Sequence, residues 1–327
     1  MKRREAVVRV LSLVALPLMA SAQGRPLRIG ALPDFIEPFG GWFYEAMREL
    51  GWRKGRDFVL IETGFPFGHQ IEPAAKRIVA EAPDIIFTVN TGYALAAHRL
   101  TKTIPIVMWT SGYPVEVGLA ESLARPGKNV TGNTNYAGTG VWGKMLELLR
   151  ELKPSTQCIG VIWDYVPPAH PREEVEPPHR ELRRAGKQLG VRIHIVEVAH
   201  PDAAPEALGE VAAARPDALV VTTGTPLFNL QAKLMQFAVE KRLPTIVDFP
   251  WRPAIQPQPL LVFAPSARDL IHRAVAYVDR IAKGAKAGEL PIQQPAKFEL
   301  VVNMKTAKVL SLTVPSSILV RADRVVE

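Results

Sequence analysis

Two threonine-glycine pairs stand at corresponding places in the two halves of the chain. The first half reads "APDIIFTVNTGY" at 82–93, and the second reads "RPDALVVTTGTP" at 215–226. An apolar run followed by Thr-Gly predicts a buried strand that ends where a helix begins. The unpaired N–H groups of a helix start bind anions and the polar ends of small ligands. The candidate binding residues at these two corners are Asn90, Thr91, Gly92, Tyr93, Thr223, Gly224 and Thr225.

Acidic, hydroxyl and aromatic residues follow the other apolar runs. Carboxylates at strand ends suit an ammonium group, and rings suit a flat or apolar group, so together they predict a cleft for a small polar solute. The alternative is a purely structural role, in which the threonines only cap helices and the rings pack inside their own domain. The remaining candidates are Asp34, Thr110, Ser111, Trp163, Asp164, Asp248 and Phe249.

Signatures of enzymes are scarce. The chain has no His-Glu-x-x-His, no paired-cysteine metal motif and no Walker loop, and its seven histidines are dispersed. We therefore expect no catalytic residue, no metal and no cofactor. Gly138, Gly140 and Gly143 do have the spacing of a dinucleotide fingerprint, with Asp164 placed 21 residues further on. The preceding stretch is polar and its unit is not the first of its sheet, so a dinucleotide-dependent enzyme is the less favoured alternative.

The repeat predicts the architecture that must position these residues. Pro83 and Pro216 are 133 residues apart, too far for a solenoid and suitable for two domains. Short apolar runs alternate with amphipathic stretches, such as 71–82, 173–189, 227–241 and 268–283, as in parallel sheets covered by helices. We predict an α/β fold of two Rossmann-like lobes with parallel sheets. Breaks at 124–132, 252–259 and 288–297 would let the chain cross between the lobes three times.

The amino-terminal stretch predicts export. Three basic residues, an apolar region and Ala-Ser-Ala at 20–22 have the order of a secretory signal, with cleavage expected after Ala22. Arg3 and Arg4 leave a twin-arginine signal open. Cys158 is the sole cysteine, so no disulfide framework is available and no cysteine after the signal can carry a lipid anchor. We expect a protein free in the periplasm.

The charge of the chain excludes some partners. Removing residues 1–22 deletes four basic residues and one acidic residue, which lowers the net charge from +8 to +5. The remaining basic residues are scattered among acids, without the block that marks a nucleic-acid arm. We therefore expect no nucleic-acid partner.

Three stretches resemble a known family. They are "VGLAESLARPGKNVTG" at 117–132, "KMLELLRELKPS" at 144–155 and the whole tail from 290 to 327. They look like the solute-binding proteins of ABC importers, including those that bind tryptophan and other aromatic amino acids. The resemblance implies the type I periplasmic-binding fold, with two lobes that are joined by three crossovers and close on a ligand.

The combined expectation is a periplasmic binding protein that delivers its solute to an ABC permease in the inner membrane. The best candidate solute is an aromatic or branched amino acid, and we expect a monomer. The alternative is a sensing subunit that presents its closed shape to a receptor kinase. The expected division is a signal peptide at 1–22, lobe 1 at 23–132 plus 262–289, and lobe 2 at 133–261 plus 290–327.

Overall fold

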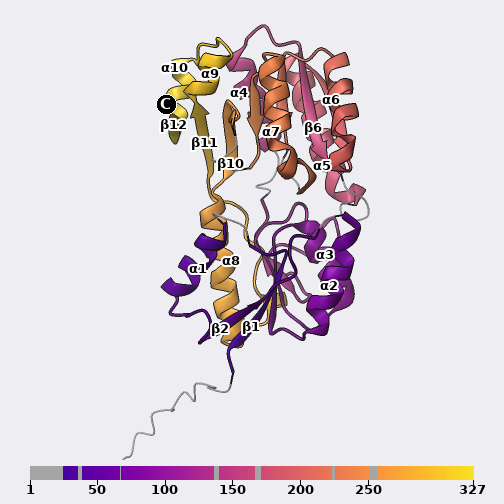
Figure 1. Ribbon diagram of the computed structural model, residues 1–327, viewed down its shortest axis with the longest axis vertical. Coiled ribbons are helices and arrows are strands. Elements are labelled where there is room, and N and C mark those ends of the chain that lie inside the picture. The colour runs from indigo at the N-terminus through magenta and orange to yellow at the C-terminus, as the bar shows by residue number, and fades with distance from the viewer. Residues whose placement is uncertain are drawn as a thin grey trace, which may run out of the picture.

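The computed structural model describes residues 25–35, 39–66, 68–135, 140–165, 171–222, 225–249 and 256–327. Two α/β lobes stand one above the other, with the amino-terminal half below in Figure 1. The expected signal peptide, residues 1–22, lies outside the described residues. Among the described residues, none of the helices is both long and apolar enough to cross a membrane.

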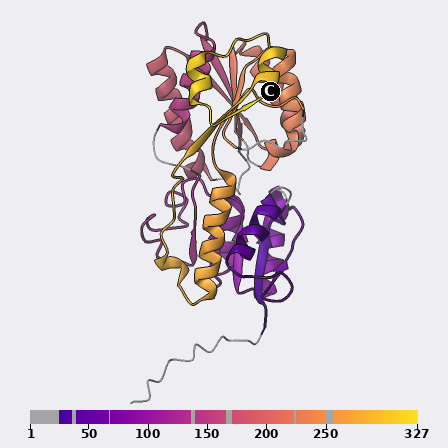
Figure 2. The same cartoon turned by 90° about the vertical axis from the view of Figure 1, so that its left-hand side faces the viewer.

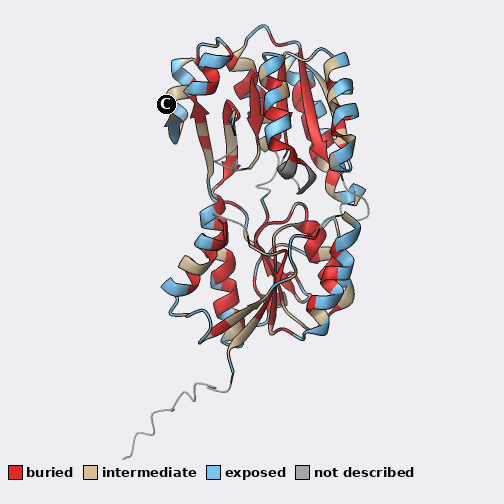
Figure 3. Cartoon of the chain, viewed as in Figure 1, coloured by how far each residue is buried: buried red, intermediate tan, exposed pale blue. Residues whose placement is uncertain are grey.

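Lobe 1 is built on a five-stranded parallel sheet in the order β2-β1-β3-β4-β5. Neighbouring residues of β3 point to opposite faces: Phe87 packs with α1 and α8, whereas Ile86 packs with α2 and α3. Both faces are therefore covered, and every residue of the central strands β3 and β4 is buried (Figure 3). The strands are β1 (Leu27–Leu32), β2 (Phe58–Ile61), β3 (Ile85–Thr88), β4 (Ile106–Met108) and β5 (Val130–Gly132). The helices are α1 (Phe39–Glu49), η1 (Gly68–Gln70), α2 (Ile71–Ala80), α3 (Thr91–Leu100), α8 (Ala267–Ala282) and η3 (Ala287–Glu289).

Lobe 2 is built on a seven-stranded sheet in the order β12-β11-β10-β9-β8-β6-β7. The sheet is parallel except where β11 pairs antiparallel with β10, a departure from the purely parallel prediction. Helices α4, α5, α9 and α10 cover one face, and α6 and α7 cover the other. The strands are β6 (Cys158–Asp164), β7 (Arg192–Val198), β8 (Ala218–Val221), β9 (Thr245–Val247), β10 (Leu261–Pro265), β11 (Phe298–Asn303) and β12 (Arg324–Val326). The helices are α4 (Val141–Leu152), α5 (Arg172–Leu189), η2 (Pro201–Ala203), α6 (Ala204–Ala213), α7 (Thr225–Glu240), α9 (Met304–Val309) and α10 (Ser316–Arg321).

The sequence repeat has the same structural role in each lobe. Pro83 and Pro216 each pack against a glycine of the neighbouring strand, where a Cβ on Gly30 or Gly160 would meet the proline at 3.3 or 3.4 Å. The aspartate after each proline then binds the main chain at the start of that strand. These bonds run from Arg28 N to Asp84 Oδ2, 2.8 Å, and from Gln157 N and Cys158 N to Asp217 Oδ2, 2.9 and 3.1 Å. Pro-Asp thus sets the register of a strand against its neighbour in both lobes.

The chain crosses between the lobes three times, as Figures 1 and 2 show, and strand pairing and packing lead us to propose boundaries that differ from the expected ones at each crossing. Strand β10 pairs with β9 and β11, so residues 262–265 belong to lobe 2. Leu290 and Ile292 pack in the core of lobe 1, so the third crossing follows them. We also place the first boundary later than 132, because the Asn133 amide donates to the carbonyls of Trp109, directly after β4, and of Leu270 in α8. We propose that lobe 1 comprises 25–135 plus 266–293.

Candidate functional site

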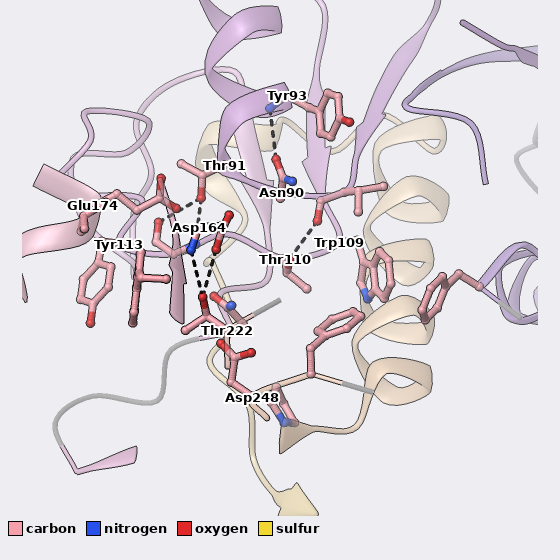
Figure 4. A pocket seen from close by; sticks show the side chains of 18 of the residues that line it. Asn90, Thr91, Tyr93, Trp109, Thr110, Tyr113, Asp164, Glu174, Thr222 and Asp248 are labelled. Carbon is pink, nitrogen blue, oxygen red and sulfur yellow. Dashed lines mark hydrogen bonds between the residues drawn. The ribbon is translucent and has the colours of Figure 1, made fainter. Parts of the chain in front are cut away.

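A cavity lies between the two lobes, at the carboxyl ends of the parallel strands (Figure 4). In open α/β sheets this edge is the usual place for a ligand, because helix starts and strand-end loops meet there. Lobe 1 contributes residues that follow β1, β3 and β4, and lobe 2 contributes residues that end β6 or follow β8 and β9. Nine predicted residues line it: Asp34, Asn90, Thr91, Tyr93, Thr110, Trp163, Asp164, Asp248 and Phe249.

The corner of lobe 1 is fixed by hydrogen bonds. Asn90 is the N-cap of α3, and its side chain accepts from the Tyr93 N–H at 3.3 Å. The buried Thr91 hydroxyl accepts from Gly112 N at 2.9 Å and lies 3.1 Å from the Ser111 hydroxyl. Thr91 thereby holds the loop after β4 against the start of α3. Ser111 supports Thr91 from behind and does not line the cavity.

The corner of lobe 2 carries a buried carboxylate. Asp164 is the last residue of β6, and Thr222 follows the adjacent strand β8. Asp164 N donates to the Thr222 hydroxyl at 3.2 Å, and that hydroxyl lies 3.2 Å from Asp164 Oδ1. Asp164 is only 8% exposed, and Asp248 lines the same cavity from the end of β9.

Aromatic rings form the walls. On the lobe 1 side, Phe39 lies 4.9 Å from Trp109 between ring centroids. Phe249 of lobe 2 reaches across to both, at 5.9 Å from Phe39 and 5.8 Å from Trp109. Rings from both lobes therefore meet at one side of the cavity, which suits a flat or apolar solute group. Within lobe 2, the paired Trp142 and Trp163 rings lie 5.0 Å apart.

A second contact crosses the cleft on the side of α5. A Cβ built on Gly112 of lobe 1 would lie 2.9 Å from Glu174 Oε1 of lobe 2. Glycine at 112 therefore allows the Glu174 carboxylate to approach the loop that Thr91 holds. Glu174 also lines the cavity.

His179 lies behind the lobe 2 wall. Its ring stands edge-on to Trp163 at 4.8 Å between centroids, and its Nδ1 is 3.8 Å from Glu197 Oε1. Burial lowers the pKa of His179 to about 4, although Glu197 opposes the shift and Arg183 adds to it. The imidazole behind Trp163 is therefore neutral near pH 7.

Of the other five predicted residues, two do not line the cavity and three lie wholly or partly outside the described residues. Gly92 lies in the first turn of α3, and Ser111 lies behind Thr91, so neither lines the cavity. Thr223 and Gly224 lie outside the described residues. Helix α7 begins at Thr225, whose side chain is outside the description.

The sequence prediction missed several lining residues. Most come from helices or loops rather than strand ends, so the strand-end criterion could not find them. The exceptions are Val89, Trp109, Thr222 and Pro265, because each of them ends a strand or directly follows one. The missed residues are Phe35, Phe39, Phe65, Val89, Trp109, Gly112, Tyr113, Asn135, Val141, Trp142, Glu174, Val175, Thr222, Pro265 and Phe298.

The dinucleotide-like glycine pattern has a different role. Gly140 precedes α4, and its N–H donates to Glu181 Oε1 at 2.6 Å. A buried carboxylate therefore lies where a pyrophosphate would have to bind, and two anions cannot share that helix start. In the part of the chain that the structure describes, no cluster of three or more His, Cys, Asp or Glu side chains could hold a metal ion.

The sequence is similar to that of known substrate-binding proteins. Residues 43–326 match the model of a family described as ABC transporter substrate binding protein. A tyrosine-binding protein of Clostridioides difficile (strain R20291) is 25% identical over 274 residues, which are 83% of this chain and 75% of that protein.

Two solved structures have the same fold. The ABC domain in complex with L-Trp from Streptococcus pneumonia covers 92% of this chain and is itself covered completely, with a TM-score of 0.80 at 19% identity. A conserved domain protein of Vibrio cholerae has the same coverage, with a TM-score of 0.82 at 20% identity. The type I periplasmic-binding fold expected from the sequence is confirmed.

Proposed function

The chain belongs to the family of ABC transporter substrate-binding proteins, and from this premise we propose that it binds an α-amino acid with an aromatic or branched side chain. The observation that carries the proposal is the composition of the interlobe cavity. Carboxylates of lobe 2, a helix start of lobe 1 and rings of both lobes line one space. The carboxylates match the ammonium group of an amino acid, the helix start matches its carboxylate, and the rings match its side chain.

The expected pose follows from the charges. The solute ammonium group lies at Asp164 and Asp248, since carboxylates at a partly dry site pair strongly with a cation. The α-carboxylate lies at the start of α3, near Asn90 and Thr91, where main-chain N–H groups point outward. The side chain lies against Trp109 and Phe249. A relative named for tyrosine binding and a neighbour solved with L-Trp support this class of solute.

Binding closes the lobes. Because the cavity is lined from both sides, a solute makes its full set of contacts only when the lobes are together, and it therefore shifts an open–closed equilibrium. The closed form presents the solute to an ABC permease in the inner membrane, without a chemical step. Export through the 1–22 segment, a periplasmic location and a monomeric state belong to the same proposal.

A ligand screen tests the function. Residues 23–327 would be purified after refolding, which removes any solute carried from the cell, and melted with each of the twenty amino acids, sugars and nucleosides. A solute at 100 times its Kd adds about 2.7 kcal/mol to the free energy of unfolding. We expect aromatic or branched amino acids to raise the melting temperature and sugars to leave it unchanged. Stabilisation by another solute class alone would overturn the proposal.

A further inference from the structure

The Thr222 hydroxyl forms hydrogen bonds with both the main chain and the side chain of Asp164. Its hydroxyl accepts from the Asp164 N–H at 3.2 Å and donates to Asp164 Oδ1 at 3.2 Å, as the dashed lines in Figure 4 show. The two residues end adjacent parallel strands, with Ile162 opposite Val221 in the register. Thr222 is 2% exposed, so its hydroxyl is largely shielded from bulk water.

This double contact restricts the carboxylate. A bond to the main chain fixes the hydroxyl relative to the backbone of Asp164, and a bond from the same hydroxyl to Oδ1 then fixes the side-chain torsions. An aspartate at a strand end has several rotamers of similar energy, and a fixed acceptor binds a cation with less loss of entropy. The contact therefore selects one direction for the carboxylate at the cavity.

We propose that Thr222 is a positioning residue that holds the Asp164 carboxylate to receive the ammonium group of the solute. The assignment rests on the proposed function, because it needs a solute with an amine. It makes Thr222 a determinant of the preference for amino acids over acids that lack the amine. Thr222 itself lines the cavity at the foot of Asp164.

A purely structural role predicts something different. The Thr222 hydroxyl also lies 3.4 Å from the Ile162 carbonyl, and it could serve only to satisfy the end of the sheet. Loss of the hydroxyl would then lower stability and weaken all solutes alike. A positioning role weakens only those solutes that carry the amine.

The test compares amino acids with their des-amino analogues. L-tyrosine, L-tryptophan and L-leucine would each be titrated calorimetrically beside hydroxyphenylpropionate, indolepropionate and methylpentanoate, respectively. In Thr222→Val we expect the preference for the amino acid to fall about tenfold or more, the usual effect of losing a hydrogen bond to a charged group. Thr222→Ser keeps the hydroxyl and should keep most of the preference.

A matched control separates folding from recognition. Thr245→Val removes a hydroxyl of similar burial, bonded to the Leu243 carbonyl at 3.1 Å at the other end of the neighbouring strand β9. It should leave the preference unchanged. If Thr222→Val does not fold, Thr222→Ala and Thr222→Ser provide the same comparison, and in an Asp164→Asn background the loss of the hydroxyl should change the preference no further.

The outcomes distinguish the two proposals. Full preference in a folded Thr222→Val or Thr222→Ala protein would overturn the positioning role alone. Equal weakening of the amino acid and its analogue would do the same. A wild-type protein that binds none of the amino acids would overturn the proposed function and the positioning role with it.

Discussion

The Phe249 ring of lobe 2 lies 5.8 Å from the Trp109 indole of lobe 1, with an angle of 63° between their planes. Phe249 also packs against the core of lobe 1 that includes Phe39 and Trp109. An aromatic side chain from one lobe thus joins the hydrophobic cluster of the other at the cavity wall. Because the two rings belong to different lobes, we expect the contact to favour the closed arrangement of the proposed binding cycle.

Removal of the Phe249 ring should weaken both closure and binding. In Phe249→Ala we expect the affinity for an aromatic amino acid to fall about tenfold, because edge-to-face ring contacts contribute ~0.5–1.5 kcal/mol beyond their buried area. The radius of gyration of the ligand-free protein, measured by small-angle X-ray scattering, should increase as the open form gains population.

The control for this variant is Tyr44→Ala. Tyr44 stacks on Phe58 at 6.4 Å within lobe 1, away from the cavity. It should cost some stability but leave the affinity and the radius of gyration unchanged. Identical scattering from Phe249→Ala and wild type would show that the ring does not hold the lobes together.

Gly112 provides a second test of the cleft geometry. In Gly112→Ala the new methyl group would meet Glu174 Oε1 at 2.9 Å, so the lobes must separate or the carboxylate must move. We expect the affinity to fall several-fold, measured by calorimetry, with little change in ligand-free stability. In a Glu174→Ala background the same substitution should have almost no further effect.

Gly209→Ala is the matched control for that substitution. Gly209 lies within α6, and a Cβ there meets nothing within 4 Å. Alanine should stabilise this helix by about 0.5–1 kcal/mol without changing the affinity. A full additive loss from Gly112→Ala in the Glu174→Ala background would contradict the steric explanation.

The sequence contained enough to predict the architecture. Buried parallel strands are continuous apolar runs, and the Pro-Asp repeat gave the two lobes because the same packing and hydrogen bonds recur at Pro83 and Pro216. The antiparallel β11 was missed because an apolar run does not show the direction in which a strand pairs. The lobe of β10 could not be predicted for a related reason: β10 is apolar enough for either sheet, and only its pairing with β9 and β11 places it in the sheet of lobe 2.

The site was only partly predictable. Strand-end residues such as Asp34, Asn90 and Asp164 could be found because the edge of a parallel sheet follows from the strands alone. Glu174 and Trp142 come from helices of lobe 2, and their place in the cavity depends on how the lobes face each other. Thr91 shows a further limit, since its hydroxyl is bonded to the loop after β4, a contact that no local pattern reveals.

His179 should make stability depend on pH. Its folded pKa of about 4 is below its ordinary value of 6.5, so the neutral form is favoured in the folded protein. The stabilisation is complete above pH 6.5 and is lost as the pH falls through 4, because the unfolded chain takes up the proton first. The shift corresponds to about 3 kcal/mol.

Urea unfolding between pH 7 and 4 would measure this loss. In His179→Phe the part of the pH dependence that belongs to this group should disappear, whereas His200→Gln, at an exposed histidine, should keep it. The same fall in stability for His179→Phe and wild type would contradict the assignment to His179.

Asn133 links the first crossover to the site, and its effect can be separated from that of Asn129. The buried Asn133 amide donates to the Trp109 carbonyl at 3.1 Å and to the Leu270 carbonyl at 2.8 Å. The Asn129 amide donates in the same manner to the Thr101 and Ile104 carbonyls, at 3.1 and 2.7 Å, at the other end of β5.

Replacing either asparagine by alanine leaves two carbonyls without their donor, which should lower the free energy of unfolding by about 1–3 kcal/mol, as measured by chemical denaturation. Only Asn133→Ala should also weaken ligand binding, because Trp109 lines the cavity and Leu270 belongs to the helix that follows the second crossing. Equal affinities of Asn133→Ala and Asn129→Ala for the ligand would show that the segment after β5 connects the lobes without supporting the binding site.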